Sequence, residues 1–156
     1  MLVHLGVDGK IEILETLNKV KLIAFLQVYM VVGISLLVFV FTMPLKTFFG
    51  RERPSRITSV KRICNMRDKE KNKSMPSGDT LACAYFIGMY YHVFNTSPVI
   101  FLCLPLVALG RVYVHCHWIG DTIIGGTGGL IAAHYLFGSP YFSTLAKPFI
   151  FAIFKL

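Results

Sequence analysis

The sequence predicts an all-helical integral membrane protein, a bundle of about four transmembrane helices with an N-terminal amphipathic helix. The first reason is composition, since 54% of the 156 residues are apolar, more than is usual in soluble domains. The second is the stretch 22–43, which carries no charged side chain and would extend about 33 Å as a helix, enough to cross the hydrocarbon core. The third is a series of shorter apolar segments at 81–94, 99–114 and 122–137.

Taken in chain order, the pattern predicts a single domain over 1–156 whose core is 44–137. Residues 11–21 repeat apolar side chains at helical spacing, which predicts an amphipathic helix lying on the membrane surface. The elements expected after it are a first span at about 22–43, a basic loop at 44–78, spans at about 79–94, 98–114 and 121–137, and a half-span or surface helix at 141–156.

The basic residues are concentrated in the predicted loop. The net charge is +8, and ten of the sixteen Lys and Arg lie between residues 46 and 73. Such a segment is attracted to acidic lipid headgroups. No nucleic-acid recognition motif accompanies it, which argues against a nucleic-acid partner. The four cysteines lack the paired spacing of a zinc site, so neither a metal site nor a disulfide framework is expected.

Alternating spans would bring three polar motifs to one side of the membrane. The first span ends before Lys46 and Arg53, and the second begins at residues 77–79. The third ends at Arg111, and the fourth begins at Asp121. Because successive spans cross in opposite directions, these four helix ends share one face. The sequence therefore predicts a single site assembled from distant parts of the chain.

The residues expected at that face suit a phosphate group. Arg53 and Arg111 can each offer a planar fork of donors, and Lys46 can offer a point charge. The backbone amides of residues 77–79, at a helix start, would point toward an anion. This combination predicts a phosphate-binding site.

A nucleophile is expected beside these cations. His117 and Asp121 are four residues apart, a spacing at which a carboxylate can fix the imidazole tautomer and stabilise its charge. The other ring nitrogen would then be free to attack phosphorus. His115, two residues earlier, is expected to point elsewhere and is interpreted as secondary.

At these positions the chain resembles the type-2 phosphatidic acid phosphatases, or lipid phosphate phosphatases. This superfamily also includes glucose-6-phosphatase, bacterial acid phosphatases and vanadium haloperoxidases. Its signature reads K-x6-R-P, then P-S-G-H, then S-R-x5-H-x3-D. The matching residues are Lys46 with Arg53 and Pro54, then Pro76, Ser77 and Gly78, then Arg111, His117 and Asp121.

The resemblance implies roles for these residues. His117 would be the nucleophile that forms a phosphohistidine, and Asp121 would assist it. The residues that would hold the phosphate oxygens are Lys46, Arg53, Ser77, Gly78 and Arg111. No metal cofactor is implied, because fixed cations stabilise the transition state.

The chain departs from the family pattern in three respects. Asp79 replaces the second-motif histidine that protonates the leaving alkoxide, and Gly110 replaces the serine of the third motif. Many members also have two additional N-terminal spans, which this sequence is expected to lack. The amphipathic helix would cover part of that gap, or the functional unit would be a homodimer. Asp79 would serve as a catalytic acid only in surroundings that keep it protonated. An isoprenoid diphosphate, whose leaving group is itself a phosphate, would avoid that requirement.

The function predicted from these observations is metal-independent hydrolysis of a lipid phosphate or isoprenoid diphosphate in the endoplasmic reticulum or another cellular membrane. The alternative, favoured by Asp79, is a catalytically silent relative that binds lipid phosphates or scaffolds membrane proteins. A haloperoxidase comes third, because those relatives are soluble and much larger. The basic loop argues for a cytosolic site, whereas the resemblance argues for a site facing the lumen or exterior.

Overall fold

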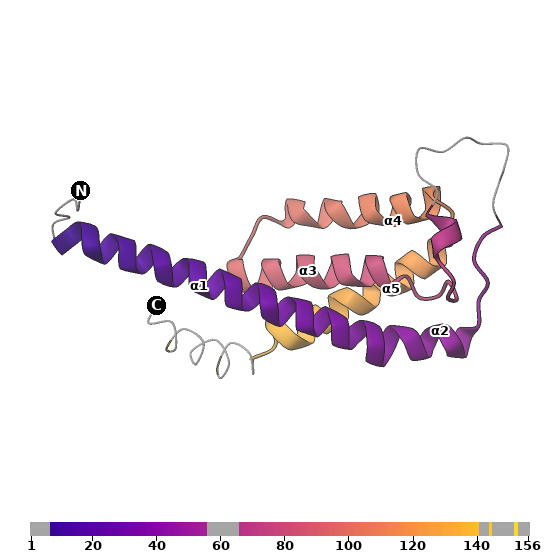
Figure 1. Ribbon diagram of the computed structural model, residues 1–156, viewed down its shortest axis with the longest axis horizontal. Helices are drawn as coiled ribbons and strands as arrows, with labels where there is room; N and C mark the ends of the chain where they lie inside the picture. The colour runs from indigo at the N-terminus through magenta and orange to yellow at the C-terminus, as the bar shows by residue number, and fades with distance from the viewer. Residues whose placement is uncertain (1–6, 56–65, 141–143, 145–151, 153–156) are drawn as a thin grey trace.

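The structure, a computed structural model, describes residues 7–55, 66–140, 144 and 152, with side chains from residue 16 onward (Figure 1). Within these ranges it contains helices and no strand, which confirms the predicted all-α class. The elements are α1 (Val7–Leu36), the π-helical turn η1 (Leu37–Thr42), α2 (Met43–Phe49), the 3-10 turn η2 (Arg67–Lys69), α3 (Gly78–Phe94), the 3-10 turn η3 (Pro98–Leu102), α4 (Cys103–Tyr113), α5 (Ile119–Ala133) and the π-helical turn η4 (His134–Gly138).

The N-terminal part of the chain forms one long helical rod from α1 through η1 to α2. The predicted boundary between a surface helix at 11–21 and a span at 22–43 is absent, because Lys21 and Leu22 both favour a helix and nothing there ends it. Within the described residues, Thr16–Phe49 is the one helix long and apolar enough to cross a membrane. The rod ends at Gly50, whose left-handed φ of 58° forms the C-cap.

The remaining helices follow the shorter apolar segments of the sequence. Helix α3 has 17 residues, or about 26 Å, less than the roughly 30 Å of hydrocarbon. The apolar stretch Pro98–Tyr113 is also short of a full span. Of the four predicted transmembrane helices, one in the described ranges is thus long and apolar enough to cross a membrane, and the multi-pass bundle stays a prediction. The others end where the chain turns, between α3 and η3 and again between α4 and α5.

Helices α3 and α5 form the closest pair in the bundle. A Cβ atom added at Gly129 would lie 2.2 Å from the carbonyl oxygen of Leu81, and one at Gly125 would lie 2.3 Å from that of Ser77. Only glycine fits at such separations, because the backbone of one helix touches that of the other. We call α3 and α5 the inner pair.

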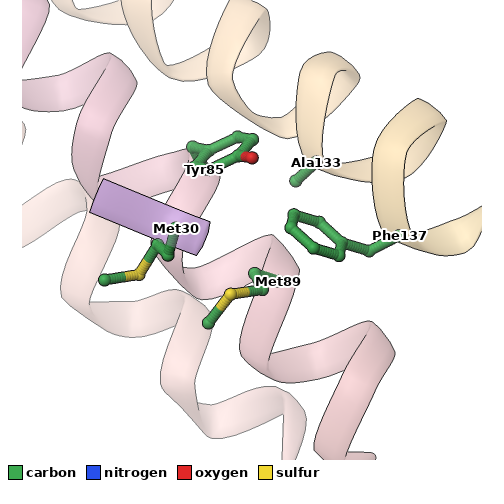
Figure 2. Packing of buried hydrophobic residues seen from close by; sticks show 5 residues of the cluster. All are labelled: Met30, Tyr85, Met89, Ala133 and Phe137. Atoms are coloured by element: carbon green, nitrogen blue, oxygen red, sulfur yellow. The ribbon is translucent and has the colours of Figure 1, made fainter. Parts of the chain in front are cut away.

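A cluster of buried side chains attaches α1 to the inner pair. Figure 2 shows Met30 of α1 facing Tyr85 and Met89 of α3, with Ala133 and Phe137 from the end of α5 and η4. The rings of Tyr85 and Phe137 pack with centroids 5.6 Å apart. This cluster is the apolar core in the middle of the bundle.

Four helix ends meet at one end of the bundle. Figure 1 shows the C-terminal ends of α2 and α4 beside the N-terminal ends of α3 and α5. This is the arrangement that alternating helix directions predict. The final predicted element, at 141–156, lies outside the described residues except for 144 and 152.

Candidate active site

His117 lies between α4 and α5, and its side chain is 2% exposed. Its Nδ1 is 2.7 Å from the carbonyl oxygen of Ser74, and its Nε2 is 3.4 Å from Nη1 of Arg53. Because a carbonyl only accepts and a guanidinium only donates, the ring proton belongs on Nδ1. The lone pair on Nε2 is therefore the one available to attack an electrophile.

The surroundings of His117 keep its imidazole neutral. Burial is the largest cause that lowers the pKa of His117, followed by the positive charges of Arg53, Lys46 and Arg111. Together they bring it to about 4, although the hydrogen bond to Ser74 acts in the opposite direction. A neutral ring near physiological pH is the form that a nucleophile needs.

Asp121 is fully buried at the start of α5. Its Oδ2 accepts a hydrogen bond from the backbone amide of Trp118 at 2.9 Å, and its Oδ1 is 3.1 Å from Nη1 of Arg51. The distance from Oδ2 to Nδ1 of His117 is 3.7 Å, too long for a hydrogen bond. The carbonyl of Ser74 therefore makes the hydrogen bond to His117 that the sequence assigned to Asp121, which instead caps α5 and adds a nearby negative charge.

Arg53 connects the loop before α3 to the segment that carries His117. Its guanidinium donates to the backbone carbonyls of Asn72 at 2.8 Å and Cys116 at 2.5 Å, and to Oε2 of Glu70 at 3.0 Å. This buried side chain is thus held beside Nε2 of His117 by both parts of the site.

Two further cationic side chains are carried by α2 and α4. Lys46, at the end of α2, is buried and donates from Nζ to the carbonyl oxygen of Lys73 at 2.8 Å. Arg111, in the last turn of α4, donates from Nη2 to Oε1 of Glu70 at 2.6 Å. Its Nε lies 2.9 Å from Oδ2 of Asp79. Asp79, at the position of the family histidine, is therefore an ion-pair partner of Arg111.

The start of α3 is bound directly to the start of α5. The amide of Ser77 donates to the carbonyl oxygen of Asp121 at 3.0 Å, and its Oγ accepts from the amide of Thr80 at 3.4 Å. Ser77 thus caps α3, and its own amide is used inside the protein. The amides of Gly78 and Asp79 occupy the first two helical positions, which lack an intrahelical acceptor. These two remain the backbone donors that suit an anion.

Two neighbouring pockets lie at or near His117. One of about 290 Å³ is lined by His117, His115 and Trp118, with Pro54, Ser55, Val112 and Ile119. The other, of about 450 Å³, lies between α4 and the inner pair and is almost entirely apolar. Val112 and Ile119 line both pockets. The two pockets therefore share part of one wall.

The structure brings the predicted site residues to one end of the bundle. Lys46, Arg53 and Arg111 surround His117, with Asp121, Ser77, Gly78 and Asp79 at the adjoining helix starts. Sequence reasoning missed Ser74, Arg51 and Glu70. Ser74 acts through a backbone carbonyl, which has no sequence signature. Glu70 was one of few acidic residues in a basic loop, and that contrast was the available signal.

Comparison with known families gives one match. A family model described as the PAP2 superfamily matches residues 24–144, more than half of the chain. The chain belongs to the PAP2 superfamily. This result confirms the resemblance to the type-2 phosphatidic acid phosphatases. Comparisons with curated proteins and with solved structures find no significant match.

Membership of the PAP2 superfamily gives the site a general chemistry. The superfamily consists largely of phosphatases, its members act on phosphate-bearing substrates, and many of them are membrane proteins. The matched region contains every residue named at the site.

Proposed function

We propose that this PAP2 protein is a metal-independent membrane phosphatase that hydrolyses a lipid phosphate or isoprenoid diphosphate through a phosphohistidine at His117. The observation that carries the proposal is the neutral, buried imidazole of His117, whose Nε2 lone pair faces the guanidinium of Arg53 at 3.4 Å. A phosphate held by Arg53, Lys46 and Arg111 would present its phosphorus to that nitrogen.

The reaction would proceed in two displacements. In the first, the Nε2 lone pair of His117 bonds to phosphorus, and the bond from phosphorus to the leaving oxygen breaks with its electrons on that oxygen. In the second, a water oxygen bonds to phosphorus, and the P–N bond breaks with its electrons returning to Nε2. Inorganic phosphate leaves with the water's oxygen, and the water's protons pass to the phosphate product or to solvent. Arg53, Lys46 and Arg111 would stabilise the charge that develops on the phosphoryl oxygens in both steps.

Asp79 supports a preference for diphosphates. It is an ion-pair partner of Arg111, and an ionised carboxylate accepts hydrogen bonds but has none to donate. A monoester leaves as an alkoxide that needs a proton, whereas an isoprenoid diphosphate leaves as a phosphate that does not. The proposal therefore ranks diphosphates above simple monoesters.

The apolar parts of the structure support a lipid substrate and a membrane location. The apolar pocket of about 450 Å³ shares Val112 and Ile119 with the pocket at His117, so it would suit the hydrocarbon chain of a substrate. The apolar window of Thr16–Phe49 is only 11% buried within the protein. A helix that exposes so much apolar surface is expected to lie in lipid. Under this proposal the shorter helices also lie within the bilayer as a multi-pass bundle.

The Asp79–Arg111 ion pair also favours a second candidate function. A silent relative would bind lipid phosphates at the same cations, or scaffold other membrane proteins, without turnover. It differs from the enzyme in one measurable respect, which is the absence of phosphate release.

The test is phosphate release by the purified full-length protein in detergent with EDTA, from acidic to basic pH. A lipid monophosphate and an isoprenoid diphosphate would be compared, together with His117→Ala. We expect metal-independent release, faster from the diphosphate, that falls by about a thousandfold or more in the variant because the nucleophile is lost.

His92→Ala is the matched control, since His92 lies near the C-terminal end of α3, away from the site, and its ring packs against that of His134. It should retain activity. Lipid phosphate binding without release from any substrate would instead support the silent relative. Equal monoesterase activity from neutral to basic pH would reject the preference for diphosphates.

A further inference from the structure

Glu70 joins the two arginines of the candidate phosphate site. Its Oε2 is 3.0 Å from Nη2 of Arg53, and its Oε1 is 2.6 Å from Nη2 of Arg111. One carboxylate thus satisfies one N–H of each guanidinium. Phosphoryl oxygens would be bound by the same donors.

The position of Glu70 also fits that of a phosphoryl group. Arg53 holds the Glu70 carboxylate through Nη2, while its Nη1 lies 3.4 Å from Nε2 of His117. A phosphate bound in place of the carboxylate would therefore sit beside the nucleophilic nitrogen. The Glu70 carboxylate occupies, within the free protein, the place where the anion is needed.

The charges at the site indicate which anion could replace it. Lys46, Arg51, Arg53 and Arg111 contribute four positive charges, and Glu70, Asp79 and Asp121 contribute three negative ones, which leaves a net charge of +1. If Glu70 moves away, the remaining charge is +2, which matches a doubly charged phosphoryl group. A singly charged phosphodiester would offer no more charge than the carboxylate that it replaces.

Glu70 is held in a way that permits such a movement. It follows the short turn η2 and caps it in an extended conformation, and its side chain is 26% exposed, unlike the buried Arg53. Burial alone would raise the pKa of Glu70, but the hydrogen bond from Arg111 and the charges of Arg53 and Arg111 outweigh it and hold the pKa below its usual range. The carboxylate is thus a charged competitor at the edge of the site.

We infer that Glu70 is a specificity-determining residue, an internal anion that occupies the phosphate subsite and yields it to doubly charged phosphoryl groups but not to singly charged phosphodiesters. This inference rests on the proposed function only in using the same subsite. It adds a selection by charge, in which phosphomonoesters and terminal diphosphates displace Glu70.

The experiment measures equilibrium binding by titration calorimetry in detergent, with inorganic phosphate and dimethyl phosphate as the probes. Wild type should bind inorganic phosphate and bind dimethyl phosphate at least tenfold more weakly. Glu70→Gln should bind inorganic phosphate about tenfold more tightly than wild type does, because the competing charge is gone. Its affinity for dimethyl phosphate should rise over that of wild type by a larger factor.

Glu52→Gln is the matched control. It removes the same charge from the same loop, but Glu52 is exposed and paired with Lys73 rather than with the two arginines. It should bind both probes as wild type does. Glu70→Asp keeps the charge and should bind both probes with nearly wild-type affinity. It provides the comparison if Glu70→Gln does not fold.

Two results would overturn the inference. Weaker phosphate binding by Glu70→Gln would make Glu70 a residue that positions the arginines, and equal changes in Glu70→Gln and Glu52→Gln would indicate a general effect of charge. Binding is measured here without turnover. A protein that shows the predicted binding but releases no phosphate from lipids would reject the proposed function while leaving this inference in place.

Discussion

The inner pair and the outer helices are packed in different ways. In α3 and α5 the backbones touch at Gly125 and Gly129, and the amide of Ser77 bonds to the carbonyl of Asp121. Helices α1 and α4 instead approach that pair through side chains and leave many of their own apolar side chains exposed. These include Val28, Val31, Leu106 and Leu109.

This difference divides the candidate site into two groups of residues. Asp121 and Ser77 belong to the inner pair, and His117 directly precedes α5. Lys46 and Arg111 are carried by the outer helical elements α2 and α4. Ser77 and Asp121 are therefore positioned by backbone packing, whereas Lys46 and Arg111 depend on side-chain contacts that can adjust.

Separating the inner pair should have the largest effect on the protein. In Gly129→Ala the new Cβ would lie 2.2 Å from the carbonyl oxygen of Leu81 and 2.8 Å from Cβ of Ala84. Backbone atoms cannot move aside as a flexible side chain can, so the helices must separate, at a cost of about 3 kcal/mol. We expect a lower unfolding temperature in detergent and the loss of phosphate release.

Gly128→Ala provides the control on the same helix. Its new Cβ would meet only side chains, those of Leu81 and Phe41, at 3.8 Å. This variant should react as wild type does and should unfold at the same or a slightly higher temperature, because alanine favours a helix over glycine. Similar losses in both variants would mean that helix composition, rather than backbone contact, sets the stability of the inner pair.

Removing a cation from an outer helix should have an intermediate effect, on the site rather than on the fold. The pKa of His117 is about 4, first because of burial and then because of the charges of Arg53, Lys46 and Arg111. The ring should therefore stay neutral until the pH falls to about 4. In Arg111→Ala the pKa should rise toward the usual histidine value of about 6.5, so that protonation begins at higher pH. NMR of ring-labelled histidine, with His117→Ala for assignment, measures this.

Lys69→Ala removes the same charge from an exposed position in the loop. In the Lys69→Ala protein, the ring resonance of His117 should titrate as it does in wild type. A wild-type His117 that protonates near pH 6.5 would contradict the burial and the cation arrangement together.

A small change on an outer helix should have the smallest effect. A Cβ added at Gly110 in α4 meets nothing within 4 Å, and alanine favours a helix over glycine by roughly 1 kcal/mol. Gly110→Ala should therefore keep its activity and unfold at a slightly higher temperature. Reduced activity in this variant would show that α4 is packed as tightly as the inner pair.

Sequence reasoning predicted the parts of this molecule that depend on residue type and spacing. The apolar runs predicted the helices, and the spacing of Lys46, Arg53, Arg111 and His117 predicted that they would meet. It could not predict that a backbone carbonyl at Ser74 would orient His117, because every residue has one. The ion pair between Glu70 and the arginines depends on the path of a loop, which periodicity does not describe.

The boundaries were less predictable for a similar reason. Residues 7–36 form one helix because no strong stop signal occurs near Lys21, and amphipathic and uniformly apolar patterns can follow one another within a helix. Gly125 and Gly129 permit the close approach of α3 and α5. The residues that they contact, Ser77 and Leu81, are identified only by the fold.

Asp121 stabilises the start of α5 and also lies near His117, and these two roles differ in what depends on them. It caps α5 through the amide of Trp118 and pairs with Arg51, while it lies 3.7 Å from Nδ1 of His117. A variant without catalysis would still need this aspartate to begin the helix. Loss of activity in an Asp121 variant would therefore report on folding as much as on chemistry, and a stability measurement beside the activity would separate the two.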